Sequence, residues 1–131
     1  MAADSLPLLC IGLMSGTSLD AVDGCLLAMT DSARMQGTDA ATPMRQLAFA
    51  SRSMPPALRA ELLALNTPGD NELHRAALAA NALMDLYAEV TEALCTQAAV
   101  QPIQIAVIGA HGQTVRHRPQ MFDGTGYTLQ L

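Results

Sequence analysis

The sequence is poor in several residue types that would each point to a particular class of protein. It contains no tryptophan and only three cysteines among its 131 residues. The cysteines are Cys10, Cys25 and Cys95, an odd number set far apart in apolar segments. This pattern argues against both a disulfide framework and a zinc site. We therefore expect reduced, buried thiols.

Basic residues are also scarce. Seven Lys and Arg stand against twelve Asp and Glu, which gives a formal net charge of −5. Proteins that bind duplex nucleic acid need basic side chains to neutralise its phosphates, so the charge argues against nucleic acid as a partner. A nucleotide is still compatible with an acidic chain, because backbone N–H groups and Mg²⁺ can carry the phosphate charge.

Long apolar runs are absent as well. No stretch reaches the about 18 apolar residues that a membrane-spanning helix needs. The N-terminal residues have no positively charged region before a long apolar one, so they do not form a signal peptide. We therefore expect no membrane segment and a cytoplasmic protein. Half of the residues are hydrophobic, which predicts one globular domain with a core.

The order of apolar runs, prolines and glycines predicts an α/β domain with a mixed β-sheet and flanking helices. The expected order is β-β-β-α-α-β-β-β. Strands are expected over 8–14, 21–29, 45–53 and 103–109, with a hairpin that pairs 113–117 with 127–131 around Asp123-Gly124. Helices are expected from Pro55-Pro56 to about Leu65, and then to about Ala98 with Asp70 or Thr67 as the cap.

Two of these strands carry further expectations. The run 103–109 is apolar and β-branched, which is typical of a central strand that is covered on both faces. In 45–53, Leu47 and Phe49 alternate with polar neighbours, as in a third, partly exposed strand.

The segment SGTS, residues 15–18, connects the first two strands. Gly16 would let backbone N–H groups approach a phosphate, and the hydroxyls of Thr17 and Ser18 could bind phosphate oxygens or hydrated Mg²⁺. An ordinary hairpin turn built of small polar residues is the alternative interpretation. The segment is not a P-loop, because no lysine follows the glycine and no helix follows the turn.

Two carboxylates follow this turn, Asp20 and Asp23. A spacing of three would place them on opposite faces of a strand. One could then face a site near Mg²⁺ while the other caps or pairs elsewhere. The alternative interpretation is that Asp20 is an ordinary turn residue and Asp23 an ordinary surface carboxylate.

The segment AHGQT, residues 110–114, directly follows the 103–109 strand, and ligands gather at the carboxyl ends of strands in α/β sheets. Gly109 and Gly112 bracket His111, which indicates a close backbone approach or an unusual turn. Gln113 and Thr114 offer hydrogen bonds suited to a sugar hydroxyl. Alternatively, the histidine only holds the turn together.

A basic cluster follows at Arg116, His117 and Arg118. Such runs are usually solvated, and we expect a solvated face here, although pairing with acids or a phosphate is an alternative. A metal site formed by His111 and His117 is not expected, because no suitable third ligand stands near.

The two motifs together resemble a known family. IGLMSGTSLDAVD, residues 11–23, and AHGQTVRHRP, residues 110–119, are similar to the anhydro-N-acetylmuramic acid kinase family of the sugar kinase, actin and heat-shock ATPase superfamily. The resemblance implies a ribonuclease H-like or actin-like ATPase lobe. It also implies an enzyme of peptidoglycan recycling that opens 1,6-anhydro-N-acetylmuramic acid and phosphorylates it with ATP and Mg²⁺.

The resemblance also assigns residues to roles. The ATP-binding stretch comprises Gly16, Thr17, Ser18, Leu19, Asp20, Ala21, Val22 and Asp23, with Ala21 standing where the family usually has glycine. The sugar side of the cleft comprises His111, Gly112, Gln113 and Thr114. No catalytic residue is assigned here, because the family's catalytic aspartate is expected beyond Leu131.

The resemblance therefore implies that residues 1–131 are the N-terminal lobe of a two-lobed kinase, cut at its C-terminal end and inactive alone, with a homodimeric full-length protein. The strand-like pattern that runs up to Leu131 also suggests a piece of a longer chain, although a short edge strand could end there. Three alternatives are a non-catalytic interaction or scaffold domain of the superfamily, another sugar or carboxylate kinase, and a hydrolase built on His111. The turn lacks the leading Asp that other sugar kinases carry, and no Gly-x-Ser-x-Gly elbow is present.

Overall fold

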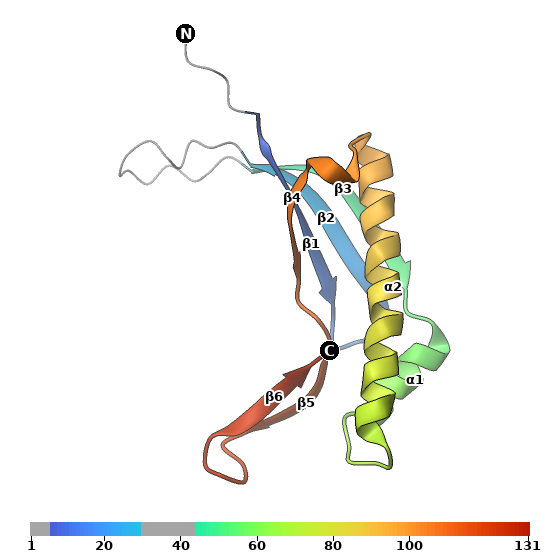
Figure 1. Cartoon of the computed structure of the whole chain (residues 1–131), viewed down its shortest axis with the longest axis vertical. Coiled ribbons are helices and arrows are strands. Elements are labelled where there is room, and N and C mark those ends of the chain that lie inside the picture. The colour runs from blue at the N-terminus through green and yellow to red at the C-terminus, as the bar shows by residue number, and fades with distance from the viewer. Residues whose placement is uncertain (1–5, 30–43) are drawn as a thin grey trace.

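The computed structural model describes residues 6–29 and 44–131 and has the predicted order of elements (Figure 1). The strands are β1 (Leu8–Ser15), β2 (Ala21–Met29), β3 (Met44–Ser53), β4 (Ile105–Ala110), β5 (Thr114–Pro119) and β6 (Gly126–Gln130). The helices are α1 (Pro56–Ala64), α2 (Glu72–Ala98) and a short 3₁₀ helix, η2 (Pro102–Gln104). No helix in these ranges is long and apolar enough to cross a membrane.

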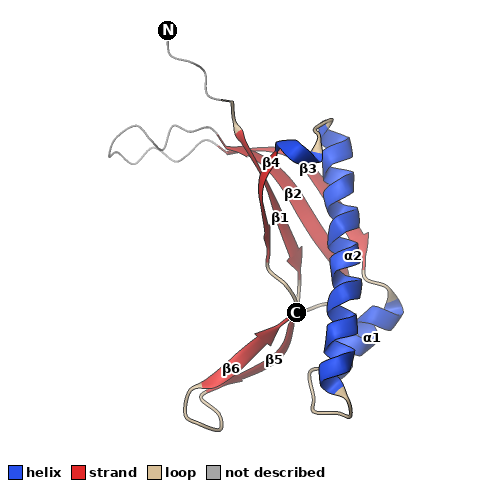
Figure 2. Ribbon diagram, in the orientation of Figure 1, coloured by secondary structure: helices blue, strands red, loops and turns tan. Residues whose placement is uncertain are grey.

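The main sheet is mixed, as the sequence predicted. Its strand order is β3-β2-β1-β4, with β1–β2 and β2–β3 antiparallel and β1–β4 parallel. The β5–β6 hairpin forms a second, two-stranded sheet that projects from the end of the main one (Figure 2). Because β1 and β4 run in the same direction, the segments that follow them, SGTS and AHGQT, emerge at the same end of the sheet.

Helix α2 packs along one face of the main sheet and buries the core with it (Figure 2). The approach is close at Gly24 of β2. A Cβ atom placed there would lie 2.5 Å from Cγ1 of Val90 and 2.9 Å from Cδ2 of Leu13. Glycine at this position therefore sets how near the helix lies to the strand.

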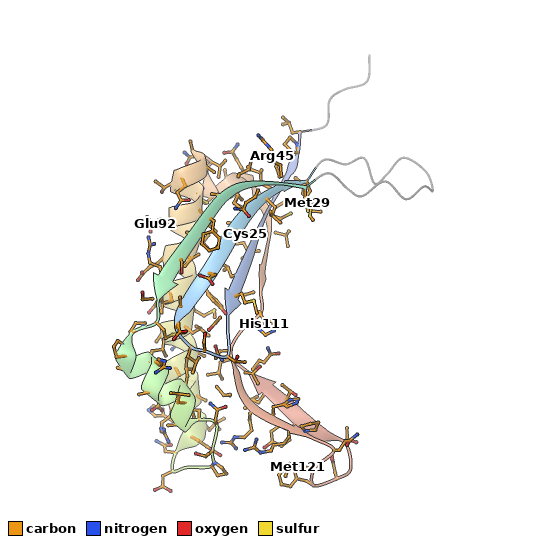
Figure 3. All side chains as sticks on the ribbon, turned by 180° about the vertical axis from the view of Figure 1, so that it is seen from behind. Cys25, Met29, Arg45, Glu92, His111 and Met121 are labelled. Atoms are coloured by element: carbon orange, nitrogen blue, oxygen red, sulfur yellow. The ribbon has the colours of Figure 1, made fainter. Side chains whose placement is uncertain are left out.

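The opposite face of the sheet carries no helix in the part of the chain that the structure describes (Figure 3). Strand β4 is an edge strand, and its Val107 and Ile108 are 53% and 50% exposed. The prediction of a central strand covered on both faces is therefore wrong for the described residues, because β1 is the only neighbour of β4. The strand also begins two residues later than predicted, because η2 takes up 102–104.

Strand β3 is partly exposed, as expected, and its core face holds the small side chains. Ala48 and Ala50 face the core, whereas Phe49 is 53% exposed and Leu47 is only half-buried. Helix α2 packs against β3, and the inward positions hold small side chains in that narrow space. The hydrophobic period alone could not reveal this preference for alanine.

The helix ends agree only partly with the predictions. Pro56 occupies the first turn of α1, as expected. The N-cap of α2 is Asn71 in a left-handed conformation, and neither Asp70 nor Thr67 caps it. Instead, the Glu72 carboxylate accepts a hydrogen bond from the Gly69 N–H at 3.2 Å, which satisfies a donor next to the helix start.

The three cysteines are free thiols. Cys95 is buried, whereas Cys10 and Cys25 are only half-buried. The prediction of buried thiols thus holds for Cys95 alone, because the other two lie in β1 and β2, whose outer face is uncovered in the described residues.

Candidate functional site

The turn between β1 and β2 is anchored in the core by one residue. The N–H of Leu19 donates to the carbonyl oxygen of Gly16 at 3.1 Å and closes the turn. Leu19 has a left-handed backbone, with φ of 55°, and its side chain is 2% exposed. Such a conformation is strained for leucine and occurs where the surroundings enforce it. Burial of the Leu19 side chain is what holds this turn in place.

The tip of the turn faces solvent. Thr17 and Ser18 are exposed, and a Cβ atom added at Gly16 would meet only the Ser18 hydroxyl, at 3.8 Å. The space above Gly16 is therefore open, and two hydroxyls stand beside it. This arrangement fits a phosphate group.

The start of helix α1 lies against this turn, and it brings a cation that the sequence reasoning missed. The Met54 N–H donates to the Asp20 carbonyl oxygen at 2.8 Å. The guanidinium of Arg59 lies 3.4 Å from the Ser18 carbonyl oxygen. The ion pairs found among the described residues use Arg52, Arg75 and Arg116, and not Arg59. No local sequence pattern indicates that Arg59 lies beside the turn, since Arg59 is 41 residues from Ser18.

The segment after β4 is fixed by backbone contacts on two sides. The His111 N–H donates to the Leu13 carbonyl oxygen at 3.0 Å. Gln113 and Leu131 exchange two backbone hydrogen bonds, of 3.0 and 2.9 Å. The segment is thus held between β1 and the residue that follows β6.

Of the two glycines around His111, only Gly112 occupies a position that requires glycine. Gly112 has φ of +75°, and an added Cβ would lie 2.5 Å from the Leu131 carbonyl oxygen. Gly109 has no atom within 4 Å of such a Cβ. The predicted close approach is confirmed at Gly112 only.

One buried hydrogen bond joins the two motifs. The Ser15 hydroxyl donates to Oε1 of Gln113 at 2.5 Å, although the residues are 98 apart in sequence. Their exposures are 3% and 4%. The side-chain carbonyl of Gln113 is therefore occupied within the protein.

His111 and Asp23 line the same hollow of about 330 Å³ on the uncovered face of the sheet, together with Met14, Cys25 and Phe49. Figure 3 shows His111 and Cys25 on this side of the molecule. Nδ1 of His111 lies 3.1 Å from the Gly112 carbonyl oxygen. The structure thus brings together a carboxylate and an imidazole from the two motifs.

The remaining assigned residues are Val22, Ala21, Asp20 and Thr114, and their surroundings differ. Val22 is fully buried in the core, and Ala21 is half-buried at the start of β2. Asp20 is exposed just before β2, so it lies in the turn rather than in a strand opposite Asp23. Thr114 is half-buried at the start of β5. No three His, Cys, Asp or Glu side chains of the described ranges could hold a metal ion between them.

Tyr87 of α2 is a second residue that the motifs did not indicate. Its hydroxyl is buried and lacks a hydrogen-bond partner among the described residues. Burial raises the pKa of Tyr87, and the nearby Gly112 N–H opposes that rise without reaching hydrogen-bonding geometry. Tyr87 therefore packs under the turn at Gly112.

The basic cluster is not a solvated face. Nη2 of Arg116 lies 2.6 Å from Oε2 of Glu72, and the Arg116 side chain is only 13% exposed. It also donates to the Leu65 carbonyl oxygen at 3.1 Å. Arg118 donates to the Asn66 carbonyl oxygen at 3.1 Å, and only His117 is exposed. The cluster ties the β5–β6 hairpin to the helices because their ends present these acceptors.

This ion pair has an electrostatic consequence. The hydrogen bond from Arg116 is the main cause that lowers the pKa of the Glu72 carboxyl below its usual value. The Gly69 N–H acts in the same direction. Glu72 therefore stays ionised to lower pH in the folded chain than in the unfolded one.

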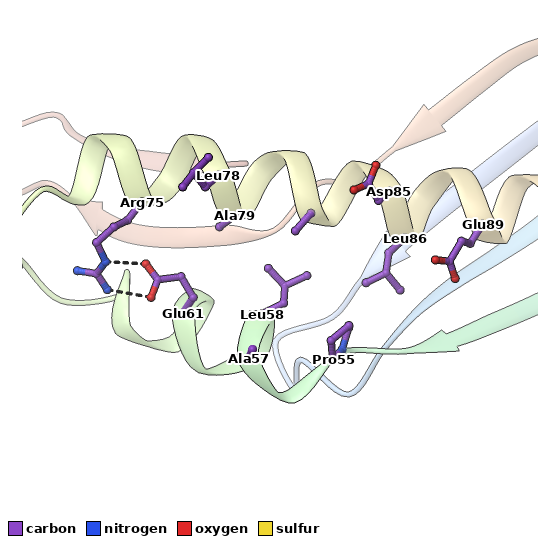
Figure 4. Close-up of a pocket in the computed structure, with 11 residues that line it drawn as sticks. Pro55, Ala57, Leu58, Glu61, Arg75, Leu78, Ala79, Asp85, Leu86 and Glu89 are labelled. Atoms are coloured by element: carbon purple, nitrogen blue, oxygen red, sulfur yellow. Dashed lines mark hydrogen bonds and ion pairs between the residues drawn. The ribbon is translucent and has the colours of Figure 1, made fainter.

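A larger groove lies elsewhere, between α1 and α2. It measures about 520 Å³ and has an apolar floor formed by residues such as Leu58 and Leu86. A two-bond ion pair, Glu61 with Arg75 at 2.6 and 3.1 Å, stands at one end (Figure 4). None of residues 15–23 or 111–114 lines this groove, so the candidate site lies at the strand ends and not here.

The mixed sheet, its helices and the hydroxyl-bearing turn are consistent with one lobe of the actin-like or ribonuclease H-like class. A sequence model of the anhydro-N-acetylmuramic acid kinase family matches residues 8–131. The chain therefore belongs to this family, which confirms the resemblance of its two motifs.

Curated relatives agree with this assignment. The anhydro-N-acetylmuramic acid kinase of Variovorax paradoxus (strain S110) is 56% identical over 121 residues, which is 92% of this chain and 30% of the relative. That of Bordetella pertussis (strain Tohama I) is 55% identical over 92% of this chain and 28% of the relative. That of Ralstonia nicotianae (strain GMI1000) is 50% identical over 92% and 29%. The chain thus spans less than a third of the length of these relatives.

Proposed function

We propose that this chain is the N-terminal part of an ATP-dependent kinase that acts on 1,6-anhydro-N-acetylmuramic acid. Water opens the anhydro ring at the anomeric carbon, and the oxygen released at position six takes the γ-phosphoryl group of ATP. The product is N-acetylmuramic acid 6-phosphate, a step of peptidoglycan recycling. The observation that carries this proposal is the meeting of both motifs, through Ser15 and Gln113, at one end of the sheet.

The nucleotide side of the proposed site is the stretch Gly16–Asp23. The open space above Gly16 admits a phosphate oxygen, and the hydroxyls of Thr17 and Ser18 donate to it. Arg59 adds a guanidinium next to the turn, which suits charge that accumulates on a phosphoryl group. Leu19 and Val22 act only by burying the turn's base in the core.

Mg²⁺ supplies charge neutralisation for the phosphates when ATP is bound. Because the described residues offer no protein cage for a metal, ATP phosphates and water would provide most of its ligands. Asp20 and Asp23 are exposed carboxylates that could hold one of those waters.

The sugar side is the segment His111–Thr114. His111 is exposed and lines the hollow with Asp23, and its imidazole offers a donor or acceptor to a sugar hydroxyl. Thr114 adds a hydroxyl in the next strand. Gly112 shapes the turn. The general base that activates water is proposed to lie outside residues 1–131. We therefore expect the 131-residue chain alone to be inactive.

The test compares variants of the full-length protein that carries this chain. Thr17→Ala and Ser18→Ala should lower kcat/KM for ATP by about 10- to 100-fold each, because each removes one donor to transferring phosphate. Thr96→Ala removes an exposed hydroxyl near the C-terminal end of α2, outside the stretch Gly16–Asp23 and the segment His111–Thr114, and should leave the kinetics unchanged. Normal kinetics in both turn variants would contradict the proposed role of the turn.

A scaffold domain of the same superfamily is the second candidate. The observation that favours it is that the Leu19–Gly16 hydrogen bond and the burial of Leu19 hold the turn without any ligand. It predicts no nucleotide affinity in the full-length protein. Isothermal titration with Mg·ATP separates the two candidates, and light scattering of the same sample tests the expected homodimer.

A further inference from the structure

We propose that Ser15 and Gln113 form a positioning pair that holds the sugar side of the site in register with the phosphate turn. The inference rests on the function proposed above and assigns a role to Ser15, which lies outside the stretch Gly16–Asp23. It also changes the role of Gln113, from a contact of the sugar to a support for its neighbours.

The burial of this pair is the first argument. Apart from Tyr87, Ser15 and Gln113 are the two polar or charged residues that are buried in ranges 6–29 and 44–131. Each satisfies the other, by a hydrogen bond of 2.5 Å. An apolar pair of the same shape would fill the space without any desolvation cost. A hydrogen bond, in contrast, fixes the distance and direction between the two side chains.

The position of the pair is the second argument. Ser15 is the last residue of β1 and directly precedes the turn. Two residues earlier, the Leu13 carbonyl oxygen accepts from the N–H of His111 at 3.0 Å. The two segments are therefore joined at two points, Leu13 with His111 and Ser15 with Gln113. Two attachment points set the orientation of one segment against the other as well as their separation.

The far side of Gln113 is also fixed. Its backbone exchanges hydrogen bonds of 3.0 and 2.9 Å with Leu131, and the side-chain amide of Gln130 donates to the His111 carbonyl oxygen at 3.1 Å. The segment His111–Thr114 thus cannot adjust independently. If the pair is broken, this segment keeps its contacts to the end of β6 and to Leu13, but it loses the second attachment, which fixes its orientation against the turn.

Phosphoryl transfer depends on that alignment, because the attacking oxygen and the γ-phosphorus must meet in line. Each half of the site still binds its own ligand when the pair is lost. We therefore expect the loss to fall on kcat rather than on either KM.

The experiment uses the full-length protein with Ser15→Ala, Gln113→Met and the double variant. Methionine keeps the length of glutamine and lacks the acceptor oxygen. Gln104→Met is the control, because Gln104 also accepts a hydrogen bond through Oε1, from the Gln101 N–H at 2.7 Å. It is exposed and lies just before β4, at the opposite end of that strand from His111. Steady-state kinetics are measured well below the melting temperature of each variant.

Each single variant should lower kcat by about 10-fold or more while both KM values stay within about threefold. The double variant should be no slower than the slower single variant, because the two residues act as a unit. Amide hydrogen exchange gives a second readout: the Leu19 amide, which is hydrogen-bonded to the Gly16 carbonyl oxygen, should exchange about 10-fold faster in Gln113→Met. The control should change neither quantity.

Three outcomes would overturn the inference. A lowered melting temperature with unchanged kcat and exchange rates would show a structural role only. A silent Ser15→Ala with a raised sugar KM in Gln113→Met would make Gln113 a sugar contact. Multiplied losses in the double variant would show independent roles. If the unmodified protein has no kinase activity, the proposed function fails, and the exchange rates alone decide on the positioning pair.

Discussion

Gly24 offers the sharpest test of how the fold is packed. Replacing it by alanine places a Cβ atom 2.5 Å from Cγ1 of Val90, 2.9 Å from Cδ2 of Leu13 and 3.0 Å from Cδ1 of Leu94. Three core side chains must shift at once, and such overpacking costs about 1–3 kcal/mol. Alanine also restricts the unfolded chain, which returns about 0.5–1 kcal/mol in a strand. We expect Gly24→Ala to be destabilised by about 0–2.5 kcal/mol in sum.

Gly12 of the neighbouring strand is the matched control. A Cβ atom there meets only Sγ of Cys25, at 3.7 Å, which is an ordinary contact. Both substitutions change the unfolded chain equally, so the difference between Gly12→Ala and Gly24→Ala isolates the packing cost, about 1–3 kcal/mol. With a urea slope of about 2 kcal/mol per molar, the two unfolding midpoints should differ by about 0.5–1.5 M.

A second substitution checks the cause. Val90→Ala removes the atom closest to the new Cβ, so its cost in the Gly24→Ala background should be smaller than its cost in the unmodified chain. Equal urea midpoints for Gly24→Ala and Gly12→Ala would refute the close helix–strand approach described above.

Further predictions concern the site and its supports. Gly112→Ala should lower the free energy of unfolding by about 2–4 kcal/mol, because it combines a left-handed φ with a backbone clash, whereas Gly109→Ala should stay within about 1 kcal/mol of the unmodified chain; similar urea midpoints would contradict this. Glu72 has a pKa lowered by Arg116, so its stabilising effect is present at neutral pH and is lost as the pH falls through its folded pKa. Melting temperatures from pH 7 to 3 should therefore fall less steeply in Glu72→Gln, and parallel curves would refute the ion pair's role. Tyr87→Phe removes a buried hydroxyl without a partner and should raise stability by about 1 kcal/mol in thermal unfolding; a loss of that size would reveal a partner.

Local sequence patterns were enough to place the helices and strands. Pro55 and Pro56 marked the start of α1, and the small polar residues after Ser15 marked the first turn. The resemblance of the two motifs was enough to identify the family. These signals all act over a few residues, which is why they can be read without a structure.

What could not be predicted depends on residues that are distant in sequence. The ion pair of Arg116 joins residues 44 apart, and Ser15 meets Gln113 at a separation of 98. Neither pair leaves a local pattern. The buried face of β3 was not predictable for a related reason, because the preference for alanine on that face comes from a helix that packs across the sheet.

The parallel pairing of β1 with β4 also bears on the order of folding. Strands β1, β2 and β3 are consecutive antiparallel neighbours, so their contacts join residues closer in sequence than those that join β1 to β4. Strand β4 can reach β1 only after the chain between them is organised, and closing such a long loop is slow. We expect the sheet's hairpins to form first and the two halves of the site to meet last. Formation of the buried Ser15–Gln113 hydrogen bond would then mark completed folding, whereas strand content would be recovered much earlier.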